Sequence, residues 1–195
     1  MPNNNIPGGY SFPYWGPLIF RTKLTRPDLC RFIDKKYHIK SVKDKLAGVV
    51  DEEYAVSPDE FMKDIEPALH LYRRAHHEYY REWITDLKCT SSWVNFMRAG
   101  DCNPIHFHHD CKLSCVLYLK IPKKLKKENA DYVGRSVGPG GIVFHYGEPR
   151  DDSITQYSLF PEERDLLIFP SNVRHEVIPF KSKGIKRISV AANLK

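Results

Sequence analysis

The chain has 195 residues, of which 42% are hydrophobic and 12% aromatic, enough for one domain with a real hydrophobic core. Its net charge is +6, it has no apolar run of 18 residues that could span a membrane, and its N-terminus lacks a signal-peptide pattern. The five cysteines include no CxxC pair, which argues against a disulfide-rich secreted protein. We therefore expect a single cytoplasmic domain whose cysteines are reduced.

The first half of the chain is expected to support the second. Residues 1–15 are predicted to be a flexible polar lead-in, and residues 16–89 a helical support region. Within it, residues 17–24 ("PLIFRTKL") have the composition of a strand. Residues 26–37 ("RPDLCRFIDKKY") carry apolar side chains at helical spacing, which predicts a short helix.

The longest helix is predicted within residues 56–84. Ser57 is suited to the N-cap, Pro58 to the first helical position, and Glu60 to a capping box. Pro67 lies inside the periodic pattern and is expected to kink or divide the helix.

After residue 90 the pattern changes to short runs rich in β-branched and aromatic residues, separated by Gly, Pro, Asp and Asn. Eight such runs without intervening helices predict a jelly roll (a double-stranded β-helix, cupin-like) over residues 90–195. The runs are 91–99, 103–110, 113–121, 140–147, 154–160, 165–171, 174–180 and 186–194. Residues 120–128 ("KIPKKLKKE") are expected to form a solvated basic loop; they lack interleaved aromatics, which argues against nucleic acid as a partner.

One segment of this β-rich half concentrates potential metal ligands. In "NPIHFHHD", His106 and His108 are two residues apart, as are His108 and Asp110. Side chains at this spacing leave a strand on the same side. Much later, "VRHEV" places His175 at the start of a strand. A non-haem Fe(II) centre uses two histidines and one carboxylate on one face of the metal, so a third ligand from a later strand is expected.

A possible anion anchor follows His175. In "KRISVAANL", Arg187 and Ser189 are two residues apart and should share one face of the last strand. Arginine can bind a carboxylate through two parallel hydrogen bonds, and a dicarboxylic co-substrate such as 2-oxoglutarate would need such a partner inside an apolar barrel.

Residues 93–194, about half of the chain, resemble the 2-oxoglutarate/Fe(II)-dependent oxygenase superfamily, most of all the prolyl-hydroxylase-like branch of bacteria and tailed phages. The resemblance is carried by "WVNFMRAGDCNPIHFHHD", "LSCVLYLKIP", "LLIFPSNVRHEVIPF" and "KRISVAANL". It implies a jelly roll, Fe(II), 2-oxoglutarate and O2, with ascorbate as a helper. It also implies hydroxylation of a small-molecule or peptide substrate, such as a peptidyl or free amino acid, in the cytoplasm (the host's, if a phage encodes the chain).

The resemblance also assigns roles to individual residues. His175 would be the distal metal ligand, and Arg187 with Ser189 would hold the far carboxylate of 2-oxoglutarate. Tyr118 matches a tyrosine that often assists there, and Asn95 matches a W-x-N feature of this branch.

The first metal pair has two possible registers. Alignment with the family motif selects His106 and His108, whereas coordination chemistry prefers His108 and Asp110, which would restore a carboxylate ligand. In the first register Asp110 could orient a ligand histidine without binding the metal itself.

Three other interpretations remain open. Cys111 and Cys115 have the spacing of a zinc-ligand pair, so the segment could hold a structural zinc ion. A non-catalytic cupin-like module that binds a metal or ligand would need no Arg187 anchor. A zinc or manganese cupin enzyme would need no 2-oxoglutarate.

Overall fold

The computed structural model describes residues 10–11, 16–25, 27–151 and 153–195. Most of the expected lead-in, residues 1–9 and 12–15, lies outside the described residues. Its Tyr10 and Ser11 form strand β1, which pairs antiparallel with β2. No helix in the described part is long and apolar enough to cross a membrane.

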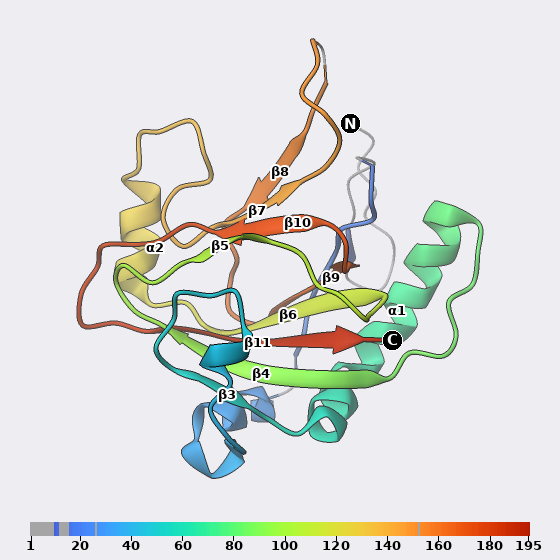
Figure 1. Ribbon diagram of the computed structural model, residues 1–195, viewed down its shortest axis with the longest axis horizontal. Coiled ribbons are helices and arrows are strands. Elements are labelled where there is room, and N and C mark those ends of the chain that lie inside the picture. Colours follow the sequence, from blue (N-terminus) through green and yellow to red (C-terminus); the bar gives the residue numbers. More distant parts are fainter. Residues whose placement is uncertain (1–9, 12–15, 26, 152) are drawn as a thin grey trace.

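The described strands form two sheets that lie one above the other in Figure 1. The larger sheet has the order β1-β2-β9-β6-β11-β4-β3, and the smaller sheet the order β5-β10-β7-β8. The strands of the larger sheet are β1 (Tyr10–Ser11), β2 (Phe20–Lys23), β3 (Glu53–Ala55), β4 (Cys89–Met97), β6 (Leu113–Lys120), β9 (Asp165–Pro170) and β11 (Arg187–Leu194). Those of the smaller sheet are β5 (Asn103–His106), β7 (Ile142–His145), β8 (Gln156–Leu159) and β10 (Arg174–Val177). All eight strands predicted after residue 90 are present, and the jelly roll is confirmed.

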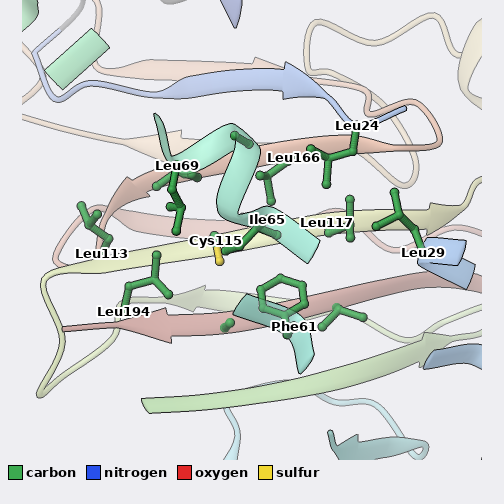
Figure 2. Packing of buried hydrophobic residues seen from close by; sticks show 14 of the residues in the cluster. Leu24, Leu29, Phe61, Ile65, Leu69, Leu113, Cys115, Leu117, Leu166 and Leu194 are labelled. Atoms are coloured by element: carbon green, nitrogen blue, oxygen red, sulfur yellow. The ribbon is translucent and has the colours of Figure 1, made fainter. Parts of the chain in front are cut away.

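Helix α1 (Pro58–Tyr80) covers the outer face of the larger sheet. Ser57 caps it by accepting a hydrogen bond from the Glu60 backbone N–H (3.3 Å), as its sequence predicted. Of the two effects expected of Pro67, a kink or a division of the helix, the division is wrong, because the helix runs through this residue without a break. Figure 2 shows Phe61, Ile65 and Leu69 of α1 packed on apolar side chains of the sheet.

Two local predictions from the sequence are corrected. Residues 27–37 form the 3₁₀ helices η1 (Pro27–Ile33) and η2 (Lys35–Tyr37) in place of an α-helix, and a third, η3 (Lys43–Lys45), follows. The expected basic loop contains helix α2 (Lys123–Ala130). Its one buried residue, Leu125, fixes the helix to the body of the protein while the lysines face solvent.

The region expected to be a helical support also contributes strands to the larger sheet. Besides β2, it contains β3, which was not predicted and which pairs with β4 as the edge strand of the larger sheet. The chain before β3 spans the gap between the two sheets, because Val49 forms an isolated antiparallel bridge with Cys102, next to β5. Residues 45–48, just before this bridge, lie along the space between the sheets.

Candidate metal centre

A cavity of about 300 Å³ lies between the two sheets. Its lining includes His106, His108 and His175 on one side, and Asn95, Tyr118, Arg187 and Ser189 from the larger sheet on the other. The structure thus brings together every residue that the sequence proposed for the site except Asp110.

Three histidines meet at the wall formed by the smaller sheet. His106 ends β5, His108 follows it, and His175 lies on β10 directly opposite His106 in the strand register. One ring nitrogen from each lies within 4.8 Å of the others, which is close enough for a single ion. The spacing of two residues between His106 and His108 turns both rings toward His175, whose ring centroid is 4.3 and 5.2 Å from theirs.

In all three rings, Nδ1 lies within hydrogen-bonding distance of an oxygen atom. Nδ1 of His106 lies 2.7 Å from the Pro104 carbonyl oxygen, and Nδ1 of His175 lies 2.9 Å from that of Val173. Nδ1 of His108 lies 2.6 Å from Oδ1 of Asn193. Because each of these partners is an acceptor, each Nδ1 carries the proton and each Nε2 offers its lone pair. Such partners on the far nitrogen are typical of histidines that bind metals.

Burial keeps these imidazoles neutral, which is the form that binds a metal. It is the largest cause that lowers the pKa values of His106 and His108. His175 is 5% exposed, and burial, followed by the nearby His106, lowers its pKa to about 3.

Asp110 is exposed and lies outside this histidine cluster. Its φ of 59° places it in the left-handed region, in the turn that carries the chain from β5 toward β6. Among the described residues, the His106/His108 register is the one that the geometry brings to a common point with His175.

The cysteines do not take part in the cluster. Cys115 is fully buried among the apolar residues between the larger sheet and α1, where Figure 2 shows it. The metal-binding group found among the described residues contains no cysteine. A structural zinc site at Cys111 and Cys115 therefore has no support from this arrangement.

Arg187 is a buried cation that lacks a counter-ion among the described residues. It is 1% exposed, and its Nη1 donates to the sulfur of Met97 at 3.1 Å. Its Nε and Nη2 have no hydrogen-bond partner in the described part of the chain. Its guanidinium carbon lies 4.9 Å from the centre of the Tyr118 ring. A buried arginine with two open donors at a cavity is suited to receive a carboxylate.

A row of polar side chains crosses the inner face of the larger sheet beside Arg187. The strand register places Glu53, Asn95, Ser189 and Tyr118 next to one another on β3, β4, β11 and β6. Oε2 of Glu53, Oδ1 of Asn95 and the hydroxyl of Tyr118 are buried without a hydrogen-bond partner in the described structure. Buried polar groups are normally paired, so these atoms indicate a ligand-binding wall.

Two of these cavity residues were not found from the sequence. Asn193 continues the alternation of Arg187 and Ser189 on β11, so the period of two residues could have revealed it. Glu53 lies on a strand of three residues, too short to leave a recognisable pattern. Both line the cavity.

Comparisons with known proteins give one family match and several similar folds. Residues 91–193 match the family model described as "Putative 2OG-Fe(II) oxygenase". No curated protein sequence matches the chain.

Several solved structures have a similar fold. A Pseudomonas putida prolyl-4-hydroxylase is 16% identical, with a TM-score of 0.54 over 91% of each chain. The structure of OsALKBH1 is 16% identical, with a TM-score of 0.61 over 94% of this chain and 99% of that one. The viral collagen prolyl hydroxylase of Paramecium Bursaria Chlorella virus-1, in complex with 2-oxoglutarate, is 14% identical, with a TM-score of 0.54 over 90% and 94% of the two chains.

Proposed function

The chain belongs to the 2OG-Fe(II) oxygenase family, whose model matches more than half of it, and we propose that it hydroxylates an amino acid, free or within a peptide. The family uses Fe(II), 2-oxoglutarate and O2. The single observation that carries the proposal is the presence of Arg187, with two open donors, in the same cavity as three convergent histidines.

The histidine cluster fits the metal. Nε2 of His106, His108 and His175 would hold Fe(II), and the carbonyl and amide oxygens behind their Nδ1 atoms would keep the rings in place. When bound, iron together with 2-oxoglutarate and O2 supplies the oxidising chemistry, which protein side chains do not provide. Three neutral imidazoles balance less of the Fe(II) charge than two histidines and a carboxylate would.

The opposite wall fits 2-oxoglutarate. Arg187 would bind its far carboxylate through Nε and Nη2, with Ser189 beside it on β11. The Tyr118 hydroxyl, buried on the neighbouring strand, would add a further donor. The surrounding apolar residues would exclude water and strengthen this charge pairing.

The proposed substrate class rests on the names of proteins with a similar fold. Two of the solved structures with a similar fold are prolyl hydroxylases by name, and one of them is a collagen prolyl hydroxylase. They support a peptidyl or free amino acid as substrate.

The direct test measures succinate formed from 2-oxoglutarate by purified protein with Fe(II), O2 and ascorbate. We expect slow turnover without added substrate, which His175→Ala should abolish. His70→Ala is the matched control, because the side chain of His70 on α1 is 70% exposed. If wild-type protein neither binds nor turns over 2-oxoglutarate, the chain is a non-catalytic cupin-like module. Turnover that survives His175→Ala would contradict the assignment of the metal site.

A further inference from the structure

Glu53 is a buried carboxylate in the cavity that the proposed chemistry does not use. It lies on β3, at the edge of the larger sheet, and is 1% exposed. The strand register pairs it with Asn95, whose Oδ1 is also without a hydrogen-bond partner in the described structure. Two neighbouring acceptors are therefore open to the cavity.

No cation of the described chain is paired with this carboxylate. Lys45 and Arg187 also line the cavity, but neither forms an ion pair with Glu53 among the described residues. Burial, and then the negative charge of Asp101, raise the pKa of Glu53 to about 7. A buried carboxylate is costly unless it is paired, which leaves the partner to be supplied by a ligand.

The position of Glu53 separates it from the anchor for 2-oxoglutarate. Its strand β3 is two strands away from β11, which carries Arg187, so their backbones are on the order of 10 Å apart at ~4.8 Å per strand. A carboxylate of the co-substrate would be attracted to Arg187 and repelled by Glu53. The open acceptors therefore belong to a second part of the cavity.

The backbone before β3 forms the floor of this second part. A Cβ added to Gly48 would lie 2.2 Å from Oδ1 of Asn103 and 3.2 Å from Oε1 of Glu53. The side-chain oxygen of Asn103 thus lies on the same side as Glu53, and Asn103 begins β5, the strand that His106 ends. Oxygen acceptors predominate here, and they favour a ligand group rich in N–H donors.

We propose that Glu53 and Asn95 form a substrate subsite that binds a cationic nitrogen group, an ammonium or a guanidinium. The inference deepens the proposed function and rests on it: the substrate, an amino acid or peptide, would present this cation to Glu53 while Arg187 holds 2-oxoglutarate. An ammonium or guanidinium supplies several donors to adjacent acceptors and neutralises the buried charge.

The test compares matched probes that differ in charge. Nα-acetyl-lysine amide is paired with its Nε-acetylated form, and Nα-acetyl-arginine amide with the corresponding citrulline amide. Affinities are measured by calorimetry on protein loaded with metal and 2-oxoglutarate. We expect at least one cationic probe to bind about tenfold or more tightly than its neutral partner. Glu53→Gln, which keeps the shape, should reduce this preference to about twofold or less.

Glu52→Gln is the matched control. Glu52 precedes Glu53 but pairs with Arg98 and Lys186 outside the cavity, so its removal should leave the preference unchanged. The inference is overturned if wild-type protein shows no preference for either cation, or if Glu53→Gln retains it. The affinity for 2-oxoglutarate is measured on the same samples. If wild-type protein fails to bind it, the proposed function itself fails, and this inference with it.

Discussion

The two faces of strand β11 show how one sheet serves two purposes. Ile188, Val190 and Leu194 face outward and pack with α1 in the apolar cluster of Figure 2. Arg187 and Asn193 alternate with them and face the cavity. Neighbouring residues of β11 thus alternate between an apolar layer and a polar cavity wall, in which some polar atoms lack a hydrogen-bond partner among the described residues.

Stability and ligand binding therefore depend on different faces of the sheet. The outward side chains of β11, Ile188, Val190 and Leu194, gain free energy from burial alone, because they have no polar atoms to satisfy. The inner wall buries a cation, a carboxylate and several hydroxyl or amide groups whose partners the described chain does not supply in full. Such groups cost stability in the free protein and are useful when a ligand completes them.

The largest effect on stability is expected from the outer layer. Phe61 of α1 is fully buried against the sheet, and Phe61→Ala should lower the free energy of unfolding by about 3–5 kcal/mol. Urea unfolding measures this, with the exposed Arg74→Ala on the same helix as control. The folded fraction should keep its affinity for 2-oxoglutarate, and a large loss of affinity would show that the two faces are coupled.

The largest effect on binding is expected from Arg187. Arg187→Met should weaken 2-oxoglutarate about 100-fold, because a charge-assisted pair is lost, while metal affinity changes little. The free protein should not lose stability, since methionine removes a buried charge without a counter-ion among the described residues. Calorimetry with metal and with 2-oxoglutarate separates the effects. An equal loss of both affinities would mean that Arg187 supports the fold and not the co-substrate.

A smaller effect, dependent on pH, is expected from Glu53. Its pKa is 4.5 ordinarily and about 7 in the folded protein, so the folded state binds more protons between these pH values. Stability should therefore fall as pH rises through this window. Glu53→Gln should remove that fall and make the free protein about 2–3 kcal/mol more stable relative to wild type at pH 8 than at pH 5. Urea unfolding at both pH values measures this difference. If the difference in unfolding free energy between the two proteins is the same at pH 5 and pH 8, the burial argument is contradicted.

The smallest effect is expected from Asn193, which orients His108. Asn193→Ala should weaken metal binding about tenfold, because the His108 ring loses the acceptor for its Nδ1 proton. Asn193→Asp keeps an acceptor and should restore the affinity. The tautomer of His108 can be followed by nitrogen NMR, and it should change in Asn193→Ala alone. If the tautomer of His108 and the metal affinity are both unchanged in Asn193→Ala, Asn193 lines the cavity but does not orient His108.

Much of the inner face could be predicted, because strands leave a pattern with a period of two residues. The spacing of His106 and His108, and of Arg187 and Ser189, placed each pair on one face before any fold was known. The eight strands after residue 90 followed from composition and from the turn residues between them.

The remainder depended on contacts between distant parts of the chain. Glu53 reaches the cavity because its short strand pairs with β4, which no local pattern reveals. The choice between His106 and Asp110 depended on where β5 ends and on the left-handed turn at Asp110. Helix α2 was not predicted because Leu125 is its one buried residue, and a single apolar residue among lysines gives no helical periodicity.

In the proposed site, three imidazoles and one guanidinium act on the same metal–co-substrate pair. The most direct test of this arrangement is a crystal structure of the protein with Mn(II) in place of iron and with 2-oxoglutarate, from crystals grown without oxygen. We expect the metal on Nε2 of His106, His108 and His175, and the far carboxylate of 2-oxoglutarate on Nε and Nη2 of Arg187. A metal held by other side chains, or a co-substrate carboxylate placed away from Arg187, would contradict the account.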